Sequence, residues 1–90
     1  MRAIKWHNKA RKQIKKIPTQ YQKSVYKHVG MLAFFSGFKD FDKNLDIIAL
    51  TNHKYDYRMR VGRYRVFFND AEQIQIIEIR EVKKRNGRTY

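Results

Sequence analysis

The clearest hydrophobic pattern in the chain runs from Tyr55 to Phe68, YDYRMRVGRYRVFF, where apolar and polar positions alternate. A period of two residues is typical of a β-strand, whose successive side chains point to opposite faces of a sheet. Gly62 and Arg63 stand at the centre, and a glycine at the first central position suits a type II′ turn. The segment therefore predicts a β-hairpin in which Val61 faces Tyr64 across the turn.

This register places positive charges opposite one another on one face of the hairpin. Arg60 faces Arg65, whereas Met59 faces Val66 on the other side, and Arg58 shares the face of Arg60. Like charges directly opposite in a sheet are destabilising by roughly 0.2–1 kcal/mol. An ordinary solvated face of an antiparallel sheet would also hold arginines. The facing pair nevertheless favours a surface that binds a polyanion, such as a phosphate backbone.

Similar patterns elsewhere in the chain predict two helices and further strands. The expected elements are a strand at 2–7, helices at 9–16 and 19–34, a loop at 36–47, a candidate extended segment at 48–51, the hairpin, a turn at Asn69-Asp70 and a strand at 73–79. Gly30 inside the second helix costs about 1 kcal/mol relative to alanine, a cost that close packing on the sheet would explain. The order β-α-α-β-β-β predicts an α+β fold with a small, mainly antiparallel sheet and two N-terminal helices on one face.

Length and composition limit the possible classes of protein. A chain of 90 residues indicates one domain, 1–90. No stretch approaches the roughly 20 apolar residues of a membrane span, and no signal peptide is visible, so a cytoplasmic protein without a membrane partner is expected. The chain has no cysteine, and its histidines follow no metal-ligand spacing. We therefore expect neither a metal nor another cofactor.

The chain is strongly basic, and its positive charge is concentrated in a few segments. The net charge is +13, from 21 lysines and arginines against 8 acidic residues, which implies a polyanionic partner such as nucleic acid, an anionic membrane or an acidic protein. A second basic group closes the chain, at Lys83, Lys84, Arg85 and Arg88. A charged end is often only solvated. This one follows a predicted strand directly, so we expect it to lie beside the hairpin.

As an ordered set of motifs, the whole chain resembles the RelE/ParE toxin superfamily of bacterial toxin–antitoxin systems. The set comprises IKWHNKARKQIKKIP and the amphipathic helix, then LTNHKYDYRMRVGRYRVFF, an isoleucine-rich strand and the ending KKRNGRTY. The resemblance implies a RelE-like microbial RNase fold and a ribosome-dependent mRNA endonuclease that inhibits translation. It further implies metal-independent attack by a ribose 2′-OH that leaves a cyclic phosphate. The implied partners are a cognate antitoxin, in a hetero-oligomer, and the ribosome with its mRNA.

The resemblance also assigns roles to particular residues. The basic pair before the glycine turn falls on Arg58 and Arg60, and the arginine of the Gly-x-Tyr-Arg element falls on Arg65. The late arginine falls on Arg85, with Lys84 as the alternative register, and the late tyrosine falls on Tyr90. Arginines would stabilise charge on the reacting phosphate, and the tyrosine would stack on a base. The other expected RNA contacts are His53, Lys54, Arg63, Lys83, Lys84 and Arg88.

The sequence leaves the general base and two other functions open. Arginine effectively keeps its proton, so Arg58 and Arg60 are poor bases where RelE-type members can have lysines. His53 and Lys84 are the alternatives, as is catalysis by positioning alone with help from the ribosome. A ParE-like inhibitor of DNA gyrase and a non-catalytic basic nucleic-acid-binding module are the other candidate functions. The sequence gives no codon preference and does not identify the antitoxin.

Overall fold

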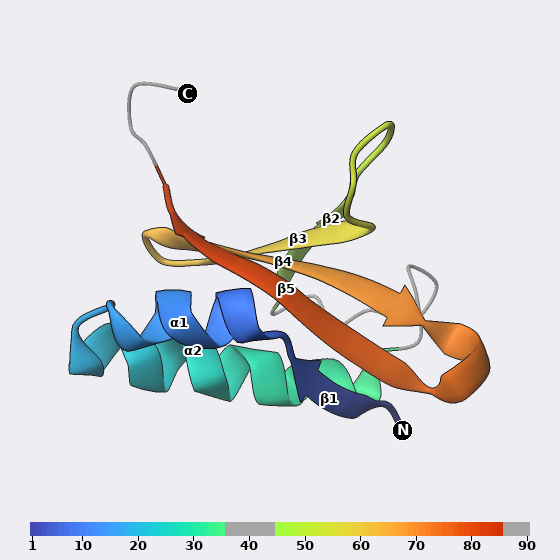
Figure 1. The fold of residues 1–90 in the computed structure, drawn as a ribbon, viewed down its shortest axis with the longest axis horizontal. Helices are drawn as coiled ribbons and strands as arrows, with labels where there is room; N and C mark the ends of the chain where they lie inside the picture. The colour runs from blue at the N-terminus through green and yellow to red at the C-terminus, as the bar shows by residue number, and fades with distance from the viewer. Residues whose placement is uncertain (36–44, 86–90) are drawn as a thin grey trace.

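The computed structural model describes residues 1–35 and 45–85 of the chain. Its elements are β1 (Ala3–Trp6), α1 (Asn8–Lys15), α2 (Thr19–Met31), the 3₁₀ turn η1 (Leu32–Phe34), β2 (Asp46–Ala49), β3 (Tyr57–Val61), β4 (Tyr64–Ala71), the 3₁₀ turn η2 (Glu72–Ile74) and β5 (Ile76–Lys84). The strands form one sheet in the order β1-β5-β4-β3-β2, in which β1 and β5 are parallel and the other pairs are antiparallel. Both helices cover the same face of this sheet (Figure 1), which confirms the predicted α+β class.

The hydrophobic core lies between the helices and the sheet. The helices bury one stripe each, with Ile14 in α1 and Val25 and Val29 in α2. The sheet contributes alternate residues of its central strands, among them Met59, Val66, Phe68, Ile77 and Ile79. The repeats of about 3.6 and 2 residues in the sequence therefore correspond to the buried faces of these elements.

The hairpin forms in the predicted register. Val61 pairs with Tyr64, Arg60 with Arg65, and Met59 with Val66. Gly62 has a φ angle of 56°, in the region that favours glycine, and Arg63 has no such positive angle. This combination agrees with the type II′ turn expected from a glycine at the first central position.

The predicted boundaries outside the hairpin were less accurate. The candidate extended segment at 48–51 is confirmed in part by β2 (Asp46–Ala49), which begins earlier, inside the expected loop at 36–47. Residues 36–44 of that loop lie outside the described part. The predicted turn at Asn69-Asp70 is wrong, because β4 continues through both residues. Their side chains bind distant groups: the Asp56 N–H donates to Asn69 Oδ1 at 2.8 Å, and Arg2 Nε donates to Asp70 Oδ1 at 2.7 Å. The next strand is consequently Ile76–Lys84 instead of 73–79.

A β-bulge in β5 decides which of its residues face the core. Phe67 pairs with Glu81 but Phe68 pairs with Ile79, so Arg80 is the extra residue. An extra residue shifts the alternation of the strand by one position. Val82 is therefore buried like Ile79, although the two are three residues apart. Without the bulge Val82 would leave the core.

Gly30 is not required by close packing, contrary to the explanation considered from the sequence. A Cβ atom added there would meet nothing within 4 Å. We expect Gly30→Ala to raise the free energy of unfolding by about 1 kcal/mol, because alanine is the better helix former. Urea unfolding measures the change, with Gly62→Ala as a control that should destabilise because of its positive φ. A Gly30→Ala protein no more stable than the parent would contradict the prediction.

Candidate nucleic-acid interface

Arginines from separate segments gather on the face of the sheet away from the helices. Arg58 and Arg60 come from β3, and Arg65 comes from β4 opposite Arg60. The backbone N–H of Arg85 donates to the carbonyl of Arg63 at 2.6 Å, so the chain after β5 still follows the hairpin. We call Arg58, Arg60, Arg65 and Arg85 the arginine face.

The electrostatics of Arg65 indicate that these four side chains lie near one another. Partial burial, followed by the positive charges of Arg58, Arg85 and Arg60, lowers the pKa of Arg65 below the usual arginine range. The group nevertheless remains protonated near neutral pH, because arginine titrates far above it. The sheet thus brings guanidinium groups together on one face, closely enough for their charges to lower the pKa of Arg65.

Two members of the arginine face differ in how their charge is compensated. Arg60 forms an ion pair with Asp46 at 2.7 Å, and both side chains are about half exposed. Arg58 has a buried Nε atom with no hydrogen-bond partner among the described residues. A buried donor without a partner costs about 1–3 kcal/mol. A phosphate oxygen is the kind of acceptor that would satisfy it.

An aromatic pair lies beside the arginine face. The exposed ring of His53 stacks on Phe67 with 5.6 Å between centroids and 3° between planes. The backbone N–H of Tyr55 donates to His53 Nδ1 at 3.1 Å. Because Nδ1 accepts this bond, the proton of the neutral ring is on Nε2. His53 therefore offers a donor at Nε2, which makes it a poor general base in this arrangement.

Glu81 is a feature that the sequence reasoning missed. It is 1% exposed, and both its oxygens bind neighbours: the Tyr55 hydroxyl donates to Oε2 at 2.6 Å, and Gln13 Nε2 donates to Oε1 at 3.4 Å. Three lysine Nζ atoms also lie near these oxygens, those of Lys9 at 3.2 Å, Lys54 at 3.6 Å and Lys83 at 3.7 Å. We call Glu81 and these three lysines the Glu81 cluster.

The surroundings of Glu81 keep it ionised. Burial alone would raise its pKa, but hydrogen bonds from Tyr55, Lys9 and Gln13 and the charge of Lys83 outweigh burial and lower the pKa to about 2. The only signal in the sequence was the change of spacing between Ile79 and Val82. That change could have indicated a bulge and the face on which Glu81 lies, but it does not indicate which residues gather around Glu81.

The other predicted site residues are divided between two places. His53, Lys54 and Lys83 lie with the aromatic pair and the Glu81 cluster. Lys84 pairs directly with Tyr64, whose ring is buried on the helix side, so Lys84 lies away from the arginine face and is not placed to act there as a base. The guanidinium group of Arg63 lies over the Tyr21 ring at 5.7 Å. Arg88 and Tyr90 fall outside the described residues.

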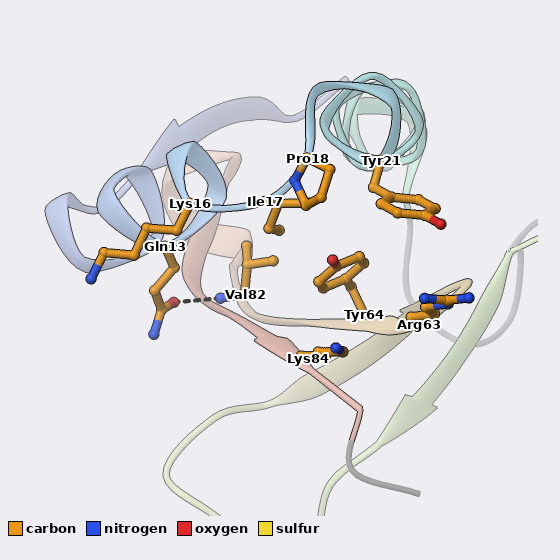
Figure 2. Close-up of a pocket in the computed structure, with 9 residues that line it drawn as sticks. All are labelled: Gln13, Lys16, Ile17, Pro18, Tyr21, Arg63, Tyr64, Val82 and Lys84. Carbon is orange, nitrogen blue, oxygen red and sulfur yellow. Dashed lines mark hydrogen bonds between the residues drawn. The ribbon is translucent and has the colours of Figure 1, made fainter.

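Lys84 and Arg63 line a pocket of about 390 Å³ between the α1–α2 connection and the tip of the hairpin (Figure 2). Ile17, Pro18 and Val82 supply apolar surface to the same pocket. The side chain of Gln13 accepts a hydrogen bond from the Val82 N–H at 2.6 Å and so satisfies a backbone donor at the edge of β5. The result is an apolar hollow with cations around it.

Within residues 1–35 and 45–85, no group of three or more histidine, aspartate or glutamate side chains is arranged to hold a metal ion. No helix in the same ranges is long and apolar enough to cross a membrane.

The fold is that of RelE toxins. The chain superposes on a chain of the archaeal RelE–RelB complex from Pyrococcus horikoshii with a TM-score of 0.77 and 23% identity, covering 96% of this chain and 97% of that one. For the toxin–antitoxin complex RelBE2 from Mycobacterium tuberculosis the TM-score is 0.73 at 15% identity, with 93% and 98% covered. For the isolated Escherichia coli RelE toxin the TM-score is 0.66 at 12% identity, with 96% of this chain and 86% of that chain covered. Neither a protein-family model nor a curated protein sequence matches the chain.

Proposed function

We propose that this chain is the toxin of a type II toxin–antitoxin system and cleaves mRNA on the ribosome. The arginine face is the observation that carries the proposal, because it concentrates guanidinium groups from three segments on an open sheet. The buried Nε of Arg58, which has no hydrogen-bond partner within residues 1–35 and 45–85, is a further donor that an acceptor would satisfy. The likeness to chains of RelE–RelB and RelBE2 complexes supports the toxin assignment. Its place of action would be the cytoplasm, where ribosomes translate.

The proposed reaction is a transesterification followed by release of the cut strand. A ribose 2′-oxygen attacks the adjacent phosphorus, its proton passes to a base or to water, and the bond from phosphorus to the 5′-oxygen breaks. The leaving oxygen takes up a proton, and the upstream fragment retains a 2′,3′-cyclic phosphate. Arg65 and Arg85 would stabilise the charge that develops on the phosphorane, while Arg58 and Arg60 hold the phosphate.

None of the general bases that the sequence offered is well placed among the described residues. Arginine keeps its proton, His53 accepts a hydrogen bond at Nδ1, and Lys84 lies on the other side of the sheet. The arrangement therefore favours catalysis by positioning and electrostatics, with the ribosome contributing to alignment of the 2′-OH. Tyr90 would stack on a base next to the scissile phosphate.

Primer extension on a translated mRNA tests the function. The purified chain is added to a bacterial translation extract, and we expect cuts at codon-defined positions that disappear when initiation is blocked. The same RNA without ribosomes should stay intact. Absence of cuts in translated mRNA would overturn the proposal. Inhibition of gyrase-catalysed supercoiling in a parallel assay would then support the ParE-like alternative.

The pocket in Figure 2 fits an apolar side chain of an acidic antitoxin. Its rim cations, Lys16, Arg63 and Lys84, complement acidic residues that flank such an anchor. The pocket lies away from the arginine face. An antitoxin could therefore bind both regions, and its contacts with the pocket can be altered without changing the proposed catalytic residues.

Charge reversal at the rim is expected to weaken this complex. The double variant Lys16→Glu, Lys84→Glu should bind the protein encoded in the adjacent reading frame at least about tenfold more weakly at low salt, chiefly through slower association. It should still arrest growth. The control Lys23→Glu, Lys27→Glu makes the same change in net charge at exposed positions of α2. Surface plasmon resonance measures the affinity of the two double variants for this partner. An equal loss of affinity in both would contradict a specific pocket.

A further inference from the structure

We infer that Lys9, Lys54 and Lys83, gathered by Glu81, form a second subsite that binds an RNA phosphodiester next to the arginine face. The inference rests on the proposed function and adds to it the path of the RNA strand beyond the reacting phosphate. The three lysines come from α1, from the loop before β3 and from β5. They are distant in sequence, and all three approach Glu81.

The geometry leaves charge and donors available to a ligand. Glu81 is 1% exposed, whereas the lysine side chains are 60%, 65% and 54% exposed for Lys9, Lys54 and Lys83. An ammonium group has three N–H donors, so each lysine retains donors for the solvent side after contacting the carboxylate. Three positive charges against one negative charge leave a local excess of two. Such a preorganised, open cationic group is suited to an anion.

Its neighbours favour a nucleotide over an acidic peptide. Lys83 Nζ lies 5.7 Å from the centre of the Phe67 ring, and Phe67 supports the exposed ring of His53 in a parallel stack. A histidine ring held in this way offers its outer surface to a base, since single-stranded RNA is commonly bound by stacking on aromatic side chains. A phosphate site beside a stacking surface matches the two parts of a nucleotide.

The subsite is also continuous with the arginine face. Lys83 is the direct cross-strand partner of Arg65, and Arg65 is the partner of Arg60. Residues paired in this way have Cα atoms only about 4.5–5.5 Å apart. One RNA strand can therefore contact the arginine face with its scissile phosphate and the Glu81 cluster with a neighbouring phosphate.

Salt dependence of RNA binding distinguishes this subsite from general attraction to a basic protein. The probe is a 2′-O-methyl RNA decamer, which lacks the attacking hydroxyl, and its affinity is measured from 50 to 300 mM salt, roughly the range where counterion release dominates. Lys54→Gln and Lys83→Gln should each lower the magnitude of the slope of log K against log salt by about 0.7. Lys23→Gln and Lys27→Gln remove the same charge from exposed positions of α2 and should leave the slope unchanged.

Stacking of a base on His53 should affect the affinity for the decamer but not its salt dependence. His53→Ala should weaken decamer binding by about tenfold with an unchanged salt slope, because stacking releases no counterions.

Acetylation of the unaltered chain provides a measurement that does not depend on variants folding. The decamer should protect Lys54 and Lys83 from the reagent and leave Lys27 reactive.

Several results would overturn the subsite. In the salt titrations, these results are equal slope changes in the α2 controls or no measurable decamer binding by the unaltered chain. In the acetylation experiment, the result is uniform protection of all lysines. A decaglutamate peptide that binds the Glu81 cluster more tightly than the decamer does would also overturn it. Failure of the proposed function is separate, because it is measured as cleavage of translated mRNA. Normal codon-positioned cleavage together with unchanged slopes in Lys54→Gln and Lys83→Gln would refute the subsite alone.

Discussion

Arg65→Ala is expected to abolish growth arrest and to reduce cleavage of ribosome-bound mRNA by about 10²–10³-fold, the usual effect of removing one group that stabilises transition-state charge. Arg65 lies at the centre of the arginine face, with Arg60 on one neighbouring strand and Lys83 on the other. Arg85→Ala should have an effect of the same order. Primer extension in a translation extract measures both variants.

Stability and partner binding separate this loss from unfolding. Urea unfolding of Arg65→Ala shows whether the variant is folded, so that a loss of cleavage can be assigned to the missing guanidinium group. Binding to the antitoxin through the pocket should persist. Arg11→Ala, at an exposed position of α1, makes the same change in net charge and should remain toxic. Full toxicity of both Arg65→Ala and Arg85→Ala would show that the site has been assigned wrongly.

The hairpin could be predicted because the residues that determine its register are close together in the sequence. The two-residue turn fixes the register, and the register fixes that Arg60 faces Arg65. The helices were predictable for a similar reason, since each carries one periodic apolar stripe. The arginine face thus follows from residues 55–68 together with the strand that pairs with them.

The Glu81 cluster could not be predicted in this way, because its members are brought together only by the tertiary fold. Lys9 and Gln13 lie on α1, about 70 positions before Glu81, and contact it because α1 packs along the edge of β5. The misplaced turn has the same cause. Asn69 and Asp70 resemble turn residues, but the groups that bind their side chains, at Asp56 and Arg2, are distant in sequence.

The bulge in β5 links these observations to function. It turns Glu81 and Lys83 toward the open face while Val82 remains in the core. Lys84 then falls on the helix side, at the pocket. One extra residue therefore sorts adjacent lysines between a face suited to RNA and a pocket suited to a protein partner. The sequence KK alone gives no indication of this division.

Glu81→Gln is expected to destabilise the chain at neutral pH by on the order of 3 kcal/mol, and the loss should disappear in acid. The pKa of Glu81 is lowered from 4.5 to about 2 in the folded chain. A carboxyl group with a lowered pKa stabilises the fold above its unfolded pKa, and this contribution is lost as the pH falls toward the folded value. Glutamine keeps an acceptor for the Tyr55 hydroxyl but supplies no charge for the three lysines.

The decisive measurement is the difference in unfolding free energy between Glu81→Gln and the unaltered chain, taken from urea titrations between pH 7 and pH 2. The difference should be largest above about pH 4.5 and shrink toward zero near pH 2. Other carboxylates titrate in both proteins, so their contributions largely cancel. Glu72→Gln, at a side chain that is 72% exposed, should show little change throughout. A pH-independent difference for Glu81→Gln would mean that side-chain shape, and not the buried negative charge, holds the cluster together.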